Sequence, residues 1–324
     1  MAKIGLIDID GAGKSFPNLA TMKISAHHKS QGDTVEWYDG LSHYDIVYAS
    51  KVFSFTPDYS QHINADSIIR GGTGYALHGP GGLDFNQNED KPLPYEIEHS
   101  MPDYSLYNIH DTAYGFLTRG CPRGCHFCIV GKKEGLKSIK VADLNEFWSG
   151  QRNIILNDPN ILASKDRENL LIQLLQSNAT IEFNQGLDIR MITPEIAKLL
   201  NSLKLSKVHF AWDRYQDKDT VLPKFEMLAK YAPRIAKSHN TLVYTITNFD
   251  TTLEQDLDRI YTLQKLNIRP YVMIYDKPNA PKIYKTLQQW CNSYAVYAKC
   301  PDFNQYNKHK HLQPSQPTNQ TSLF

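Results

Sequence analysis

The chain has 324 residues, of which 41% are hydrophobic and 21% are charged, so it can bury the core of one large globular unit or of two moderate ones. Lysine and arginine total 35 against 34 acidic residues, and a formal net charge of +1 excludes a chain-wide basic surface for nucleic acid or an anionic membrane. No apolar run approaches the ~18 residues of a membrane span, and the N-terminus lacks the pattern of a secretion signal. We therefore expect a cytoplasmic protein without membrane contact.

The first hundred residues alternate between strand and helix patterns. Residues 3–9 predict a strand and residues 16–30 a helix. Short strands are predicted at residues 34–37, 45–49 and 67–70. This order predicts an α/β fold that begins with a Rossmann-like or flavodoxin-like parallel sheet with right-handed crossovers.

A change of composition separates this region from the next. Residues 79–107 are rich in Gly, Pro, Asn, Asp and Tyr and lack apolar periodicity, which is typical of a linker. We place a Rossmann-like domain with its linker at residues 1–105. A second domain is predicted at residues 106–290, and a C-terminal extension with a polar tail at residues 291–324.

The second domain again alternates strands and helices. Strands are predicted at residues 113–118, 153–156, 180–183, 207–211, 241–246 and 269–274. Helices are predicted at residues 141–149, 167–176, 194–203, 221–232 and 253–266. About six strand-and-helix units are fewer than the eight of a closed barrel, so we expect a partial (β/α)6 TIM-like barrel.

Three of the five cysteines lie within eight residues. Cys121, Cys125 and Cys128 follow the first strand of the second domain, in the string TRGCPRGCHFC. An odd cysteine number with such a cluster suits metal binding in a reducing compartment better than a disulfide framework. Three thiolates at these spacings can wrap one face of a four-iron cluster, and Gly120 and Gly124 allow the backbone turns that aim them. One iron would then stay open to a substrate or cofactor.

This motif, CxxxCxxC with the aromatic Phe127 before the last cysteine, resembles that of the radical S-adenosylmethionine superfamily. Further segments resemble the branch that carries an N-terminal cobalamin-binding-like domain, and the likeness covers most of residues 1–290. These segments are residues 102–104, 118–122, 157–160, 210–213 and 244–252. The resemblance implies a [4Fe-4S] cluster on the three cysteines and S-adenosylmethionine beside Phe127 at the open iron. It also implies reductive cleavage to a 5′-deoxyadenosyl radical and an electron donor such as flavodoxin or ferredoxin.

The sequence departs from the family pattern at two places. The glycine-glycine-glutamate that binds the cofactor's amino group is replaced here by Asn157-Asp158-Pro159, so that role passes to Asn157 or Asp158. The glycine-any-glutamate of the fourth strand becomes Ala211-Trp212-Asp213, which keeps a shorter carboxylate.

Other polar residues are expected at the carboxyl ends of the strands, where functional groups of α/β folds gather. Arg190 could pair with the carboxylate of S-adenosylmethionine and Asp188 could bind a ribose hydroxyl, or the two could form only a surface ion pair. By resemblance, adenine or ribose contacts are expected from the ends of the fourth and fifth strands. The residues concerned are Asp213 and Arg214 at the fourth strand, and Thr247 and Asn248 at the fifth. Asn184 and Gln185 follow the third strand, as Asp188 and Arg190 do, and are also candidate cofactor-binding residues.

Two further ligand questions stay open. No Asp-x-His-x-x-Gly string for a histidine-ligated cobalamin occurs in residues 1–105, so cobalamin is compatible only in a form without that ligand. The three cysteines with His126, Cys291 or Cys300 could instead hold zinc in a non-catalytic interaction module. Cys291 and Cys300 otherwise look like ordinary core residues.

The substrate is not encoded in a recognisable motif. It could be a small molecule, a peptide or a nucleic acid. Methylthiolation of tRNA is disfavoured, because the N-terminal half has no cysteine for a second cluster.

Overall fold

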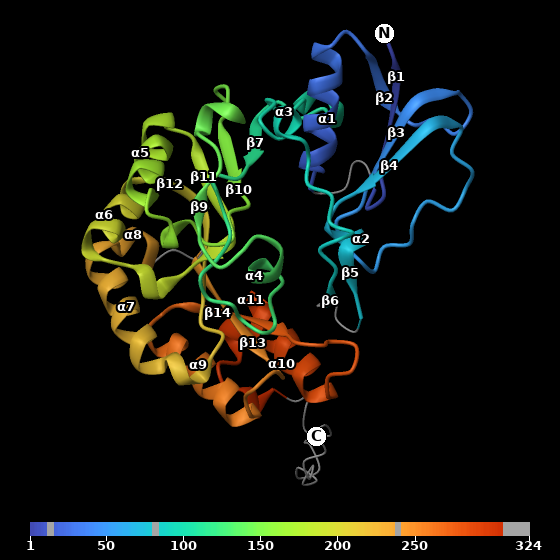
Figure 1. Cartoon of the computed structure of the whole chain (residues 1–324). Coiled ribbons are helices and arrows are strands. Elements are labelled where there is room, and N and C mark those ends of the chain that lie inside the picture. The colour runs from blue at the N-terminus through green and yellow to red at the C-terminus, as the bar shows by residue number, and fades with distance from the viewer. Residues whose placement is uncertain (12–15, 80–83, 237–240, 307–324) are drawn as a thin grey trace. The chain divides into compact units, whose positions relative to one another are not determined.

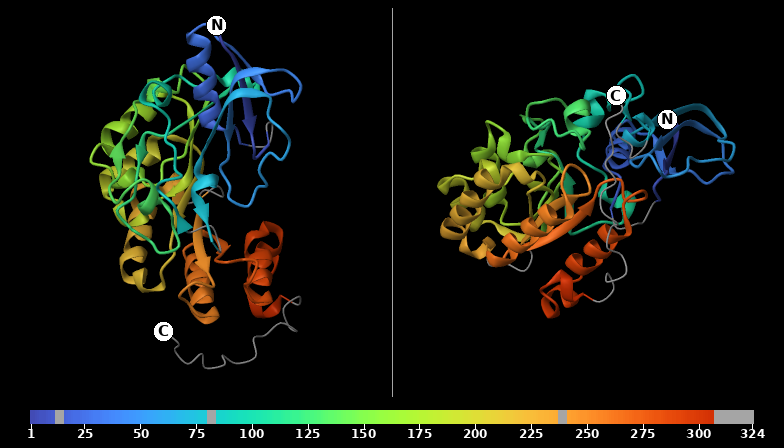
Figure 2. Two further views of the ribbon diagram at one scale, coloured as in Figure 1. Left: turned by 45° about the vertical axis from the view of Figure 1, so that its right-hand side comes forward. Right: turned by 90° about the horizontal axis from the view of Figure 1, so that it is seen from below.

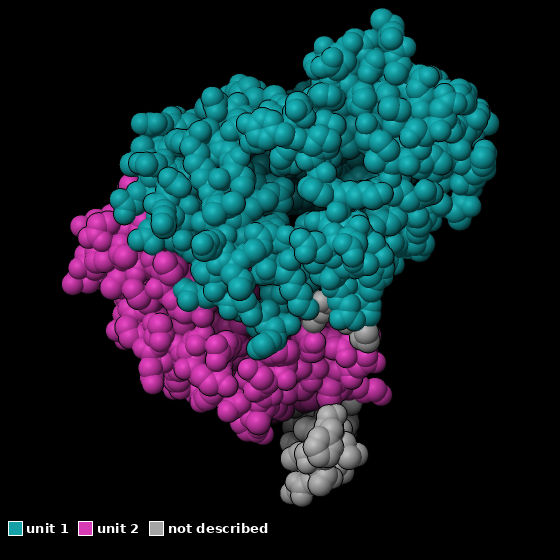
Figure 3. Space-filling model, viewed as in Figure 1, with its two compact units in different colours: residues 1–185, 203–205 teal, residues 186–202, 206–324 magenta. Residues whose placement is uncertain are grey.

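A computed structural model describes residues 1–11, 16–79, 84–236 and 241–306, and it has a mixed α/β fold with two parallel sheets. The chain divides into two compact units (Figure 3). The first unit comprises Met1–Gln185 with Leu203–Leu205, and the second comprises Gly186–Ser202 with Ser206–Phe324. The predicted domain limits at residues 105 and 290 stay predictions.

The first sheet lies at the start of the chain (Figure 1). Its strands are β1 (Lys3–Asp8), β2 (Thr34–Trp37), β3 (Tyr44–Ser50) and β4 (Ala65–Gly71). Their order is β2-β1-β3-β4, and every neighbouring pair is parallel. The four predicted strands are confirmed with small changes at their ends.

Helix α1 (Leu19–Ser30) covers one face of this sheet (Figure 2). It begins later than the predicted residue 16, because the Asn18 side chain accepts hydrogen bonds from the N–H groups of Ala20 and Thr21 and so caps the first turn. Ile24 packs with Ile4 and Leu6, and all three are buried.

The second sheet has six strands in the order β14-β13-β12-β11-β10-β7, which follows the chain. These strands are β7 (Thr112–Gly115), β10 (Asn153–Leu156), β11 (Thr180–Leu187), β12 (Lys204–Ala211), β13 (Thr241–Thr247) and β14 (Arg269–Ile274). The helices that alternate with them are α5 (Arg167–Ser177), α6 (Pro194–Ser202), α7 (Lys218–Tyr231) and α9 (Leu253–Lys265). The alternation expected from the sequence is therefore present.

Shorter elements complete the described chain. In the first unit they are α2 (Thr73–Ala76), β5 (Leu77–His78), β6 (Asp84–Phe85), α3 (Tyr95–Glu98), β8 (Thr118–Arg119), α4 (Val130–Lys133) and β9 (Ile139–Lys140). In the second they are α8 (Pro233–Ala236), α10 (Lys282–Asn292) and α11 (Tyr294–Lys299). The 3-10 turns are Tyr104–Tyr107, Leu144–Glu146, Ile161–Ala163, Ile189–Met191, Tyr215–Asp217 and Phe303–Gln305. Of the predicted polar tail, residues 307–324 lie outside the described residues.

The helix predicted at residues 141–149 is wrong. Only one 3-10 turn, Leu144–Glu146, forms there, and it begins at a capping box between Asp143 and Glu146. Phe147 leaves the helical conformation and packs against Gly115, where an added Cβ would lie 2.4 Å from the Phe147 ring. Tertiary packing of one aromatic ring thus ends the turn.

Two strand predictions also needed correction. The strand predicted at residues 113–118 is divided into β7 and β8, and β8 turns away to pair antiparallel with β9. The strand predicted at residues 180–183 continues to Leu187, so Asn184 and Gln185 lie within β11 rather than after it. Gly186, within β11, has φ of +96°, a backbone conformation that favours glycine.

The second unit has a core built around its last strand. Trp290 of α10 is fully buried with Val272 of β14 and Ile260 of α9. Phe303 and Cys291 belong to the same cluster. Among the described residues, none of the helices combines the length and apolar character needed to cross a membrane.

Candidate functional site

The three clustered cysteines lie on one loop of the first unit, residues 120–137, which we call the Cys loop. It leaves β8 and contains α4. Cys121, Cys125 and Cys128 are all partly exposed, and no disulfide involves them. The loop therefore presents three thiols within reach of solvent.

The two ends of the Cys loop are bonded to each other. Cys121 N–H donates to Gly135 O at 3.1 Å, and Gly120 N–H donates to the Glu134 carboxylate at 3.1 Å. Gly120 has φ of +84°, and an added Cβ would lie 2.1 Å from Lys137 O. Only glycine satisfies both the backbone conformation and this close approach. The first cysteine is thus fixed at the point where the loop closes.

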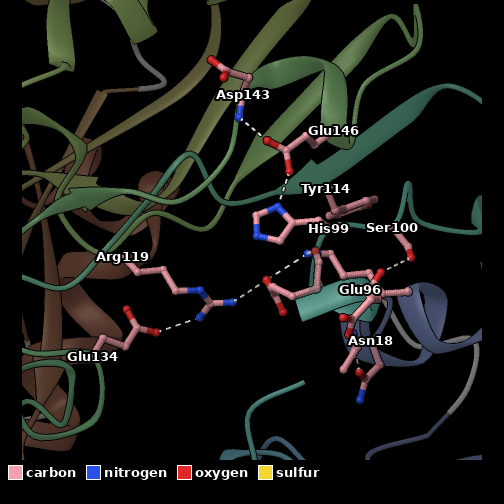
Figure 4. A network of polar contacts seen from close by, with 12 residues as sticks. Asn18, Glu96, His99, Ser100, Tyr114, Arg119, Glu134, Asp143 and Glu146 are labelled. Atoms are coloured by element: carbon pink, nitrogen blue, oxygen red, sulfur yellow. Dashed lines mark hydrogen bonds and ion pairs between the residues drawn. The ribbon is translucent and has the colours of Figure 1, made fainter. Parts of the chain in front are cut away.

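Arg119 holds the same end of the loop from outside (Figure 4). Its guanidinium donates to Glu134 at 2.9 Å, lies 3.6 Å from the Glu98 carboxylate and stacks 3.9 Å from the Phe116 ring centroid. In the same view His99 contacts the Glu146 carboxylate. Glu134 accepts from both Arg119 and Gly120, which joins the loop to β8.

Asp158, a predicted cofactor ligand, is buried beneath the start of the Cys loop. Its carboxylate accepts hydrogen bonds from Leu117 N–H at 3.1 Å and from Thr118 N–H at 2.5 Å and hydroxyl at 2.7 Å. Burial raises the pKa of Asp158 to about 6, and the hydrogen bonds from Thr118 and Leu117 oppose this rise. These hydrogen bonds hold the backbone that joins β7 to β8, so Asp158 stabilises the start of the Cys loop.

Asn160 lies next to the first cysteine, a contact that sequence reasoning missed. Its side-chain N–H group is 3.4 Å from Cys121 Sγ, and its backbone carbonyl oxygen accepts a hydrogen bond from Ser138 Oγ at 2.8 Å. The signal was present as the last residue of the Asn157–Asn160 string, but the sequence does not reveal which of the four side chains turns to the sulfur. An amide N–H directed at sulfur stabilises a thiolate.

The other predicted residues of the first unit form one more contact. Asn184 Nδ2 donates to Asn157 Oδ1 at 3.1 Å, which brings together the end of β10 and the middle of β11. Gln185 is exposed, whereas Phe127 is partly buried within the Cys loop.

In the second unit, Asp188 and Arg190 form an ion pair with each other, and their expected contacts with S-adenosylmethionine stay predictions. Arg190 Nε lies 2.8 Å from Asp188, and a second guanidinium nitrogen lies 2.8 Å from Asp217. Asp188 is buried and also accepts from the Arg190 N–H at 3.1 Å. The pair is thus part of a small network rather than an isolated surface contact.

Asp213 and Thr247 lie at the ends of β12 and β13. Desolvation raises the pKa of Asp213 to about 6, although Arg259 lowers it. Thr247 is buried and its hydroxyl donates to Met273 O at 3.3 Å. Their roles toward a cofactor stay predictions.

Arg259 of α9, absent from our predictions, holds the same strand ends. It is fully buried and donates to the carbonyl oxygens of Trp212, Asp213 and Ile246 at 2.5 to 2.8 Å. Its counter-charge is Asp256, at 2.5 Å and equally buried. Among the described atoms, Arg259 Nε and Asp256 Oδ2 have no hydrogen-bond partner.

The side chains of the Cys loop have the chemistry that a metal cluster needs, but no assembled metal site is found among the described residues. The loop supplies three partly exposed thiols and an N–H directed at one of them. Within the described residues, no three His, Cys, Asp or Glu side chains are gathered in an arrangement that could hold a metal ion.

Cys291 lies in the core as expected, whereas Cys300 is only partly buried. Cys291 is fully buried, and burial raises its pKa to about 12. Cys300 Sγ contacts Asp302 O at 3.4 Å.

No model of a known protein family matches the chain, and a search of curated proteins finds no match.

Proposed function

We propose that the chain is a radical S-adenosylmethionine enzyme. The observation that carries this proposal is the CxxxCxxC loop, placed after the first strand of a six-stranded parallel sheet whose order follows the chain. In such sheets the loops that follow strands carry the functional groups.

The strand orders support the finer assignment of the fold within this proposal. The order β2-β1-β3-β4 agrees with a Rossmann-like or flavodoxin-like half, and the sequential six strands agree with a partial (β/α)6 barrel. The proposal includes a cytoplasmic enzyme, an electron donor such as flavodoxin or ferredoxin, and cobalamin only in a form without a histidine ligand.

The residues of the Cys loop would have distinct tasks. Cys121, Cys125 and Cys128 would hold the cluster, and Asn160 would donate to the sulfur of Cys121. Asp158 and Glu134 would fix the backbone that aims this cysteine. When bound, a [4Fe-4S] cluster would supply the electron that cleaves S-adenosylmethionine to methionine and a 5′-deoxyadenosyl radical.

The test is anaerobic reconstitution of the full chain with iron and sulfide. We expect about four irons per chain, brown charge-transfer absorption, and 5′-deoxyadenosine when S-adenosylmethionine and dithionite are added. Cys121→Ala, Cys125→Ala and Cys128→Ala should each lose the iron and the product, whereas Cys300→Ala should keep both.

Two results would contradict the proposal. One is a colourless chain that binds one zinc ion through the same cysteines, which would establish the interaction module instead. The other is a fully iron-loaded chain that yields no 5′-deoxyadenosine.

A further inference from the structure

Strand β4 forms one edge of the first sheet. Within the described residues it pairs with β3 alone (Figure 1). Residues 66–70 are all exposed, including the β-branched side chains of Ile68 and Ile69, which are 38% and 39% exposed. Because these two neighbours point to opposite faces, apolar surface is exposed on both sides of the edge.

This edge has little of the usual protection against pairing. In an edge strand every second residue directs an N–H and a C=O away from the sheet, and proline, charged side chains (above all lysine), a bulge or a covering element normally prevents pairing there. The charged side chains of β4 are Asp66 and Arg70, which have opposite signs. β4 has seven residues, continuous parallel pairing from Ile46–Ser67 to Ser50–Gly71, and neither proline nor lysine. Its backbone can therefore accept another strand.

The sequence of β4 is complementary to itself in an antiparallel arrangement. With a two-fold axis at Ile68, Asp66 of one copy lies opposite Arg70 of the other, and the two Ile68 side chains face each other. Residues 66, 68 and 70 share one face, so two ion pairs flank an apolar pair. On the other face Ile69 lies opposite Ser67.

We propose that two copies of this chain pair antiparallel through β4 and join their four-stranded sheets into one continuous sheet. The present contacts of the charged residues do not oppose this. Asp66 lies 3.1 Å from His43 and Arg70 lies 3.5 Å from Asp58, and all four side chains are well exposed. Such exposed pairs contribute little, so they can be exchanged for pairs across the two-fold axis.

The area of one strand pair is small, so the dimer should be concentration-dependent, with dissociation in the micromolar range. Sedimentation velocity of the full chain over a concentration series measures this directly.

Asp66→Arg alone or Arg70→Asp alone places like charges opposite each other at both ends of the pairing. Each should weaken dimerisation by about tenfold or more.

The variant that carries both Asp66→Arg and Arg70→Asp is the decisive one. It restores opposite charges across the axis and should return the dissociation constant to near the wild-type value, which a merely unfolded chain could not do. Leu41→Lys, at a residue 87% exposed outside β4, is the matched control and should leave dimerisation unchanged. A wild-type chain that stays monomeric throughout the series, or single variants that dimerise as well as wild type, would overturn the proposal.

Discussion

At the scale of single residues, Asp158 combines burial with three accepted hydrogen bonds. Its pKa of about 6 in the folded chain lies above its ordinary value of 3.8, so the folded state binds this proton more tightly than the unfolded state. The contribution of Asp158 to stability is therefore greatest below about pH 4, and it falls as pH rises through about 6. A rise of about two pKa units corresponds to at most about 3 kcal/mol.

Asp158→Asn should remove this pH dependence. Relative to wild type, the variant should gain free energy of unfolding as pH rises from about 4 to about 7, in urea titrations at several pH values. Asp111→Asn, at an exposed position of the same unit, should run parallel to wild type. A constant difference between Asp158→Asn and wild type at every pH would show that Asp158 does not titrate in this range.

Arg259 is a fully buried cation, and its counter-charge Asp256 is fully buried beside it. Arg259→Leu should lower the free energy of unfolding by about 3–5 kcal/mol, because it leaves Asp256 buried without a cation. Adding Asp256→Asn to that variant should recover part of the loss in urea titrations. The partly exposed pair Lys218–Asp258, at 2.6 Å, provides the control, and Lys218→Ala should cost less than about 1 kcal/mol. Equal costs for the two single variants would contradict a special role for burial.

At the scale of elements, the Cys loop depends on one close backbone approach. Gly120 and Gly135 both have positive φ, +84° and +89°, but only at Gly120 would a side chain strike neighbouring atoms. Both alanine variants should lose about 1–2 kcal/mol of unfolding free energy, because a residue with a Cβ disfavours a positive φ. Gly120→Ala should in addition displace Lys137 and open the loop.

We therefore expect Gly120→Ala to lower the melting temperature more than Gly135→Ala, and to bind less iron under the same reconstitution conditions. Thermal unfolding of the unloaded chain separates the structural effect from metal loading. If the two variants melt at the same temperature, the approach between Gly120 and Lys137 is not a constraint on the loop.

At the scale of the whole molecule, the alternation of strands and helices could be predicted because its signal is local. Apolar residues recur with strand or helix periodicity in β1, β10 and α5, and the structure has them where the pattern indicates. The failures share a cause that is not local. Phe147 ends a turn because its ring packs on Gly115. Strand β11 continues to Leu187, beyond its run of apolar residues, because it is hydrogen-bonded to neighbouring strands of the sheet.

The candidate site was predictable to a similar degree. The cysteine spacing identified the loop, but the roles of Asp158 and Asn160 depend on where β10 brings them, about 40 residues away along the chain. Arg259 gave no signal, because a buried arginine in a helix has the same sequence pattern as an exposed one.

The contact between Gly115 and Phe147 has a consequence for how this protein can change over evolutionary time. A side chain at position 115 and an aromatic ring at position 147 occupy the same space, so neither site can drift independently of the other. Among descendants of this sequence, a larger residue at 115 should arise only together with a smaller one at 147, and the two columns of their alignment should covary.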